Sequence, residues 1–356
     1  MAEEVGVSAK TVSNAYRAPG QMTPELRQRI LDTAARLGYA GPDPVASSLR
    51  RGRVGAIGVL YANQLSYAFD DPNTNALLSG ITAAADAAGV GLLLLPGSVD
   101  DDRRTSAVSG AVVDGIIASS LAEDDPLLHT VVSRRLPLVV VDQPNPAVLA
   151  TLSPEPIPWI GIDDRTAAAE VADHLLELGH RHLGVVSFAL RRGTPTGFAT
   201  VADQGAATLS VTRNRLLGYA DAARRYGLDW TRVPVSQGVD STPAEGEKGA
   251  LAVLSTSPRP TALICTSDRL AQGALAAAAA LGLRVPHDLS IVGFDDAPHL
   301  ADRLDLTTVH QPSRIKGQHA AAALLALVEG IDPQPAPMPG TTLVIRGTTT
   351  SPAPSL

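Results

Sequence analysis

The chain has 356 residues, of which 45% are hydrophobic and 18% charged, and its formal net charge at pH 7 is −7. This length exceeds one small core and favours two or three domains, while the apolar fraction excludes a disordered chain. The single cysteine, Cys265, excludes an internal disulfide and a metal site built from several cysteines.

The N-terminus has no export signal, because Met1 is followed by Ala2-Glu3-Glu4 rather than by a basic start and an apolar stretch. The longest mostly apolar runs, at 90–95 and 271–283, are shorter than the ~18 residues that a membrane span needs. We therefore expect a cytoplasmic protein without a membrane partner.

Charge is distributed unevenly along the chain. Residues 1–53 carry eight basic and five acidic side chains, a net charge of +3, so the remainder carries −10. A mildly basic head on an acidic body indicates an anionic partner for the head alone.

The first predicted elements are two short helices joined by a turn at Gly6. Ser8 stands where a helix N-cap belongs, and Val12 and Ala15 fall at helical spacing to face inward. This pattern predicts a helix-turn-helix, whose second helix enters the major groove of DNA. A small solvated helical hairpin is the alternative for this stretch taken alone. The candidates for DNA contact are Lys10 and Asn14, for base edges, and Ser8, Thr11 and Ser13, for phosphates.

A third helix is predicted to begin after Thr23, with Pro24 in its first turn, and to end at Gly38. Together the three helices predict a compact headpiece over residues 1–41. Residues 42–53 read as a linker followed by a short helix-compatible stretch at 45–50. The core positions expected on the third helix are Leu26, Ile30, Leu31, Ala34 and Leu37.

From residue 54 onward, apolar strands alternate with amphipathic helices, which predicts an α/β fold of parallel sheets with helices on both faces. Eight strands over about 290 residues fit two such domains better than one. The strands are expected at 56–60, 92–95, 115–118, 138–141, 183–186, 261–265, 290–294 and 343–345. The helices are expected near 74–88, 103–113, 165–178, 212–226, 245–256, 269–281 and 314–328.

Several predicted strands end in aspartates. Ligands of open α/β sheets bind beyond the carboxyl ends of the strands, so these acids indicate a cleft. An aspartate can instead cap the helix that follows a strand. We expect Asp142 and Asp295 to contact a ligand, and Asp268 and Asp296 to cap helices.

The segment 288–296, Asp-Leu-Ser-Ile-Val-Gly-Phe-Asp-Asp, resembles the lactose/galactose-repressor family of transcriptional regulators. The resemblance extends over nearly the whole chain, through fragments in the same order and spacing. These include Gly6-Val7-Ser8, Leu37-Gly38-Tyr39, Pro44-Val45-Ala46, Leu178-Gly179-His180, Thr266-Ser267-Asp268 and Leu306-Thr307-Thr308-Val309.

This resemblance implies an architecture and a function. The helix-turn-helix headpiece (1–41) is followed by a linker and hinge helix (42–53), a two-lobed core like periplasmic sugar-binding proteins (54–350) and a tail (351–356). The N-lobe would comprise 54–162 and 313–340, and the C-lobe 163–311 and 341–350. The family pattern implies a homodimeric repressor that binds a pseudo-palindromic DNA operator under the control of a small polar, sugar-like effector, with no cofactor.

The resemblance also implies roles for residues that contact DNA. Lys10 and Asn14 match base-reading positions, with Ala9 beside them. The stretch 45–50 matches the hinge helix that folds on the operator's minor groove. There Leu49 matches an apolar wedge that kinks the duplex, and Ala46 matches a small residue lying against the groove.

For the effector, the resemblance implies contacts from Asp142, Arg215, Asp295 and Ser313. A guanidinium and two carboxylates can bracket adjacent hydroxyls with charge-assisted hydrogen bonds, which suits a sugar or similar polyol. Members of the family often contribute a ring that stacks on the effector, and a polar contact, from the loop after the first strand. For Phe69, the alternative is a position in the hydrophobic core. The candidates in this loop are Tyr67, Phe69 and Asp70.

The sequence departs from the family pattern in three places. Family members carry further residues before the position of Met1, so we expect a shortened first helix, weakened DNA binding and a start codon assigned too late. The segments 143–159 and 188–210 are longer than the usual loops and are expected near the cleft rim, where they would reshape effector choice. The C-terminus lacks a heptad pattern for a tetramerising coil.

Two other classes of protein are alternatives to a transcriptional regulator. An enzyme is disfavoured, because the chain lacks a Gly-x-Ser-x-Gly elbow, a Walker phosphate loop and a His-Glu-x-x-His helix. His174, His180 and His182 resemble metal ligands, but 180–182 is expected to be a solvated turn, and Cys265 a buried thiol without chemistry. The remaining alternative is a cytosolic small-molecule sensor or solute-binding protein that no longer binds DNA.

Overall fold

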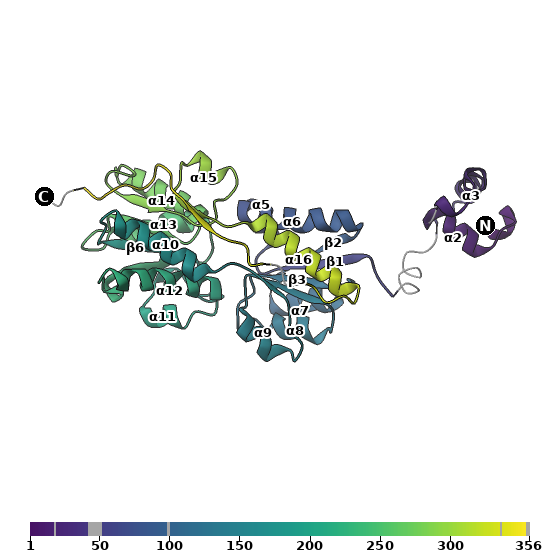
Figure 1. The fold of residues 1–356 in the computed structure, drawn as a ribbon, viewed down its shortest axis with the longest axis horizontal. Coiled ribbons are helices and arrows are strands. Elements are labelled where there is room, and N and C mark those ends of the chain that lie inside the picture. Colours follow the sequence, from purple (N-terminus) through teal and green to yellow (C-terminus); the bar gives the residue numbers. More distant parts are fainter. Residues whose placement is uncertain (18, 42–51, 98–99, 335–336, 354–356) are drawn as a thin grey trace. The chain divides into compact units, whose positions relative to one another are not determined.

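The computed structural model describes residues 1–17, 19–41, 52–97, 100–334 and 337–353, and it divides into two compact units, Met1–Gly55 and Ala56–Leu356 (Figure 1). The stretch 45–50, with Ala46 and Leu49, lies outside the described residues. Among the helices that the structure describes, none has the length and apolar character needed to cross a membrane.

The first unit is helical, as predicted. Gly6 takes a left-handed conformation (φ 70°) that ends the first helix, and Thr23 Oγ1 accepts the Leu26 N–H at 3.3 Å to cap the third. Pro24 occupies the first turn of that helix, where its missing N–H is not needed. The elements are α1 (Ala2–Val5), α2 (Ala9–Arg17), the short 3₁₀ helix η1 (Pro19–Gln21) and α3 (Pro24–Arg36).

A small core holds these helices together. Val5, Val12, Ala15 and Ile30 are buried against one another, which confirms the inward faces predicted for α2 and α3. The prediction for Leu37 is wrong: it is 46% exposed, because α3 ends at Arg36 and the chain turns away at Leu37 and the left-handed Gly38 that follows.

The second unit contains two five-stranded, mainly parallel sheets, each with helices on both faces, which confirms the predicted α/β class. The first lobe has the strand order β2-β1-β3-β4-β5, all parallel. Its strands are β1 (Ala56–Tyr61), β2 (Gly91–Pro96), β3 (Ile116–Ser119), β4 (Leu138–Val141) and β5 (Trp159–Ile160). One face packs on α6 (Pro72–Ala88) and α16 (Ser313–Val328), the other on α7 (Asp101–Gly110), α8 (Leu127–Ser133) and α9 (Pro146–Leu152), and α5 (Leu65–Asp70) follows β1.

The second lobe has the strand order β10-β9-β6-β8-β7, in which only β7 runs antiparallel to its neighbour. Its strands are β6 (Leu183–Ser187), β7 (Gly197–Phe198), β8 (Val235–Gln237), β9 (Ala262–Cys265) and β10 (Ser290–Val292). Helices α10 (Asp164–Glu177) and α12 (Ser210–Arg225) cover one face, and α13 (Pro243–Leu254) and α14 (Asp268–Ala280) the other. The connections between these strands and helices contain the short helices α11 (Val201–Gly205), η2 (Trp230–Arg232) and α15 (Leu300–Arg303).

The chain passes between the lobes more than once. After the second lobe it forms β11 (Thr308–His310), enters the first lobe as α16, and returns as β12 (Thr342–Val344), which pairs antiparallel with β11 (Figure 1). Both lobes are therefore built from segments far apart in the sequence.

The two segments expected to be long loops contain regular structure. Residues 143–159 hold α9 and the start of β5, and residues 188–210 hold β7, α11 and the start of α12. The strand β8 and the helix α8 were also missed. All of these elements are short, and a short apolar run carries too little periodicity to be recognised.

The expectation of a solvated turn at 180–182 is wrong for His180, which is buried. Its Nδ1 lies 2.8 Å from Thr261 Oγ1, and its Nε2 lies 2.9 Å from the Thr350 carbonyl oxygen. Burial lowers the pKa of His180, against the opposing effect of the Thr350 carbonyl. His180 therefore connects the C-terminal segment to the second lobe. In the described residues, no cluster of His, Cys, Asp or Glu could hold a metal ion.

Candidate functional site

The outward face of α2 is the first candidate site. Ser8 Oγ accepts the Thr11 N–H at 3.0 Å, and the two hydroxyls lie 2.9 Å apart, so the helix begins where the sequence predicted. Opposite the buried Val12 and Ala15, this face presents one cation, one amide and several hydroxyls to solvent. Its residues, exposed or partly exposed, are Ser8, Ala9, Lys10, Thr11, Ser13 and Asn14.

Two arginines of α3 hold the other helices in place, Arg27 contacting α2 and Arg29 contacting α1. Arg27 Nε donates to the Ala15 carbonyl at 3.1 Å, and Arg29 donates to the Val5 carbonyl at 3.3 Å. Arg36 forms an exposed ion pair with Glu4 at 2.7 Å. Part of the positive charge counted in the sequence therefore organises the helices rather than facing solvent.

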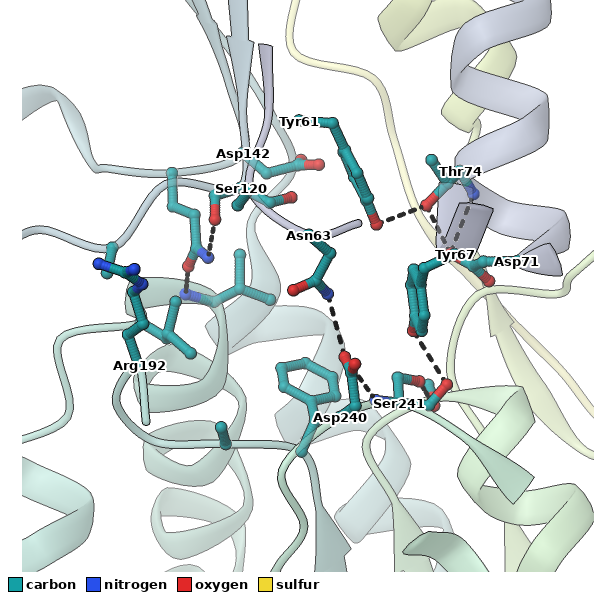
Figure 2. Close-up of a pocket in the computed structure, with 18 of the residues that line it drawn as sticks. Tyr61, Asn63, Tyr67, Asp71, Thr74, Ser120, Asp142, Arg192, Asp240 and Ser241 are labelled. Atoms are coloured by element: carbon teal, nitrogen blue, oxygen red, sulfur yellow. Dashed lines mark hydrogen bonds between the residues drawn. The ribbon is translucent and has the colours of Figure 1, made fainter. Parts of the chain in front are cut away.

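The second candidate site is a cavity of about 490 Å³ between the two lobes of the second unit (Figure 2). Its lining comes from the carboxyl ends of strands in both sheets, where ligands of open α/β sheets bind. Among the residues expected to contact an effector, Tyr67, Asp142, Arg215 and Asp295 line this cavity.

At one rim the lobes are joined by four residues that we call the clasp: Asn63, Tyr67, Asp240 and Ser241. The Asn63 amide donates to Asp240 Oδ1 at 3.0 Å, and the Tyr67 hydroxyl donates to the Ser241 carbonyl at 2.9 Å (Figure 2). Burial raises the pKa of the Asp240 carboxyl and of the Tyr67 phenol. The phenol therefore remains a neutral donor across the cavity mouth.

Two side chains lie against the ring of Tyr67. The Tyr61 ring stacks against it with a centroid distance of 6.4 Å, and the Arg269 guanidinium lies 4.9 Å from its centroid. Tyr67 therefore lines the cavity, as expected, and also bridges the lobes through its hydroxyl.

A second set of contacts joins the lobes elsewhere along the cavity. Arg213 forms a two-pronged ion pair with Glu123, at 2.6 and 2.8 Å, and Arg192 pairs with Asp101 at 2.6 Å. These arginines come from the 188–210 segment and the helix after it. The lobes are thus held together by charge on one side and by the clasp on another.

The floor of the cavity is built around Arg215. Its guanidinium donates to Asp164 at 2.8 Å and to the Thr266 carbonyl at 2.6 Å, and it lies 3.5 Å from the centroid of the Phe294 ring. Burial raises the pKa of the Asp164 carboxyl, while Arg215 opposes that rise. Asp295 lies 3.8 Å from the same guanidinium.

Backbone strain accompanies the two carboxylates at the floor. Asp295 has φ 127° and Asp142 has φ 62°, and these positive values are unusual for residues other than glycine. The Gln311 amide donates to Asp295 Oδ1 at 2.5 Å, and Lys316 donates to Asp142 at 2.8 Å. Burial raises the pKa of the Asp295 carboxyl well above its usual range, against the opposing Arg215.

Three expected effector residues do not reach the cavity. Phe69 is 59% exposed on α5, and Asp70 is exposed beside it. Ser313 is buried and donates to Asn73 at 2.5 Å, so it supports the wall from behind. Asp71, the residue after Asp70, lines the cavity and caps α6 by accepting the Thr74 N–H.

The helix-capping roles expected for Asp268 and Asp296 are wrong. Ser267 caps α14, and Asp268 instead accepts from Thr308 Oγ1 at 2.5 Å and from the Ala297 N–H at 2.7 Å. Asp296 pairs with Arg346 at 2.8 Å. Both carboxylates are used to tie together loops and strands that the sequence places far apart.

Several residues of the cavity were not anticipated. Gln311, which lines the cavity, and Lys316, which contacts it from behind, carry no local sequence signal for these positions. Asp71 carried a usable signal, since Asp-Pro before an apolar helical stretch is a helix start. Asn63 and Asp240 also line the cavity without having been expected there, whereas Phe188, Arg191 and Arg192 belong to the segment 188–210 that was expected near the cleft rim.

Comparison with known proteins identifies relatives along nearly the whole chain. Residues 172–349 match the family model of the periplasmic binding protein-like domain. An HTH-type transcriptional regulator of Mycobacterium tuberculosis is 41% identical over 91% of this chain and 89% of its own length. The HTH-type transcriptional regulator IpsA of Corynebacterium glutamicum is 39% identical over 92% and 90%.

A solved structure agrees with these relatives. The crystal structure of a LacI-family transcriptional regulator from Corynebacterium glutamicum is 35% identical, with a TM-score of 0.74, over 98% of this chain and 97% of that one. The named relatives are regulators of transcription rather than enzymes.

Proposed function

Because the chain belongs to the lactose/galactose-repressor family of transcriptional regulators, we propose that it is a homodimeric cytoplasmic repressor whose cavity takes a sugar-like effector. Its relatives share the name of HTH-type transcriptional regulators. Repression, the homodimer, the cytoplasmic location and control by a sugar-like effector go beyond what these names state and belong to the proposal.

For DNA, we assign the exposed face of α2 to the major groove of a pseudo-palindromic operator. Lys10 and Asn14 would contact base edges, and Ala9 would lie beside them. Ser8, Thr11 and Ser13 would bind phosphates. The geometry that supports this is the separation of faces on α2, since Val12 and Ala15 are buried while these six residues face solvent. From the family resemblance alone we assign Ala46 and Leu49 to the minor groove.

For the effector, we assign the cavity between the lobes, with Asp142, Arg215 and Asp295 as its principal contacts. The observation that carries this assignment is their convergence on one cavity of about 490 Å³. Asp142 and Asp295 follow strands of different lobes, and Arg215 comes from α12. Carboxylates beside a guanidinium favour a ligand rich in hydroxyl groups. Such a ligand touches both lobes, so its binding changes how they close.

The test is fluorescence anisotropy with DNA from upstream of the protein's own gene, over a salt series. Asn14→Ala should weaken binding to the specific site by roughly 10- to 100-fold, the value of a base contact. It should leave the salt-dependent binding to unrelated DNA largely intact. An equal loss on both DNAs, or no loss on either, would contradict the assignment of α2.

A further inference from the structure

Below the cavity floor lies a buried lysine that none of the effector contacts named so far includes. Lys316, in the first turn of α16, is 1% exposed. Its ammonium donates to both carboxylate oxygens of Asp142, at 2.8 and 3.0 Å, and to Gln311 Oε1 at 2.8 Å. All three N–H donors of the ammonium are thereby used.

The contact with Gln311 reaches the second carboxylate. Since the Gln311 carbonyl oxygen faces Lys316, its amide N–H must face the other way, where it donates to Asp295 Oδ1 at 2.5 Å. One side chain thus sets the orientation of Asp142 at the end of β4 and, through the Gln311 amide, of Asp295 in the other lobe. Both carboxylates are in the cavity lining.

The charge of this arrangement limits what can bind. The Asp142 side chain is 18% exposed, and its negative charge is balanced by the ammonium behind it. A ligand ammonium placed on Asp142 would lie a few ångströms from Lys316 and be repelled, as like charges are in a poorly solvated site. A ligand hydroxyl can donate to the same carboxylate without that repulsion.

We propose that Lys316 is a positioning residue that determines specificity, because it holds Asp142 as a charge-balanced acceptor for a ligand hydroxyl and against a ligand ammonium. The specificity part rests on the proposed function, in which the cavity takes a sugar-like effector. The positioning part rests only on the contacts of Lys316 with Asp142 and Gln311.

The positioning is tested without any ligand, by urea unfolding of the full chain. Lys316→Met leaves Asp142 as an unbalanced, poorly solvated carboxylate and should lower the unfolding midpoint. Adding Asp142→Asn should restore much of that loss, and Lys316→Arg should retain much of the midpoint. The control is Lys248→Met, at an exposed lysine of α13. A double variant no more stable than Lys316→Met would show that Lys316 acts by packing alone and would overturn the positioning claim. If only the double variant folds, the claim is supported.

The specificity is tested by calorimetric titration of the full chain with neutral sugars and their 2-amino-2-deoxy counterparts: glucose, galactose and mannose against glucosamine, galactosamine and mannosamine. The wild type should prefer the neutral member at least tenfold. Lys316→Met should shift the ratio of the two affinities toward the amino sugar by at least tenfold, and Lys248→Met should leave this ratio unchanged.

An unchanged ratio in Lys316→Met, or a wild type that prefers the amino sugar, would overturn the specificity claim. If no sugar binds to either protein, the sugar assignment of the proposed function fails and the specificity claim fails with it. In that case, the unfolding experiment still decides the positioning claim.

Discussion

The Arg215 guanidinium forms contacts within the protein that need no ligand, since it donates to Asp164 and to the Thr266 carbonyl and lies over the Phe294 ring. We therefore expect Arg215→Ala to have two effects. It should abolish the response of DNA binding to the effector, and it should lower the free energy of unfolding by roughly 3–5 kcal/mol, because Asp164 is left buried and unpaired.

Urea unfolding and anisotropy measure these two effects of Arg215→Ala separately. Adding Asp164→Asn to the Arg215→Ala variant should recover part of the stability but none of the effector response. An effector response that persists in Arg215→Ala would remove this residue from the binding site.

Asp268 should make the stability of the protein depend on pH. Burial raises the pKa of its carboxyl to about 7, against hydrogen bonds from Thr308 and Ala297 that lower it. A carboxyl with a raised pKa in the folded state favours folding while it is protonated. Its stabilising contribution is therefore complete below its unfolded pKa, near 4, and is lost as the pH rises through about 7.

Asp268→Asn should remove this dependence. An asparagine can still accept the Ala297 N–H, and its amide can donate to the Thr308 hydroxyl. Each pKa unit corresponds to about 1.4 kcal/mol, so the wild type should lose of the order of 3 kcal/mol relative to the variant between pH 4 and pH 7. Urea unfolding across this range measures the difference, and parallel curves for the two proteins would refute the role given to Asp268.

Among the elements, the crossing of α6 and α16 depends on glycine. A methyl group on Gly80 would overlap the Arg314 carbonyl, and one on Gly317 would overlap the Leu77 carbonyl. Gly80→Ala should therefore destabilise the protein by at least about 2 kcal/mol, because backbone must move to make room. Gly110→Ala at the end of α7, where nothing lies within 4 Å, is the matched control and should be close to neutral. Thermal unfolding compares the two.

The clasp connects α5 to the loop after β8, and its strength can be measured by hydrogen exchange. Tyr67→Phe removes the hydrogen bond to the Ser241 carbonyl but keeps the contacts of the ring with Tyr61 and Arg269. Loss of about 1 kcal/mol should speed exchange in 65–70 and 239–242 about fivefold. Tyr226→Phe, at an exposed hydroxyl on another part of the second lobe, should leave these segments unchanged. Equal rates in both variants would mean that the clasp does not limit opening.

Long periodic elements were predictable from the sequence, and contacts between distant elements were not. The eight longest helices of the described residues, α3 among them, and the mainly parallel sheets follow from patterns within 10–17 residues. Asp142 and Asp295 could be expected at a cleft because strand ends converge in this fold class. His180, Tyr67 and Asp268 each have partners 29 or more positions away in the sequence. No local pattern encodes these.

At the scale of the whole molecule, specific operator binding and binding to unrelated DNA should respond differently to a mutation in the stretch 45–50. Leu49→Ala removes the proposed minor-groove wedge, so it should weaken specific operator binding by roughly 10- to 100-fold. It should not alter the salt dependence of binding to unrelated DNA, which reflects phosphate contacts. Anisotropy between 50 and 200 mM salt tests this, and a changed salt slope would place Leu49 outside the role of a wedge.

The late position of α16 has a consequence for how the protein is made. The face of the first sheet that bears Ile57, Val59 and Ile117 is covered partly by Ala320, Ala321 and Leu324, about 150 residues beyond the last strand of that sheet. At roughly 5–20 residues per second, the ribosome needs on the order of ten seconds or more to supply this cover. During that interval an apolar surface is open on the growing chain, so the nascent first lobe should be a substrate for chaperones while the second lobe is still being synthesised.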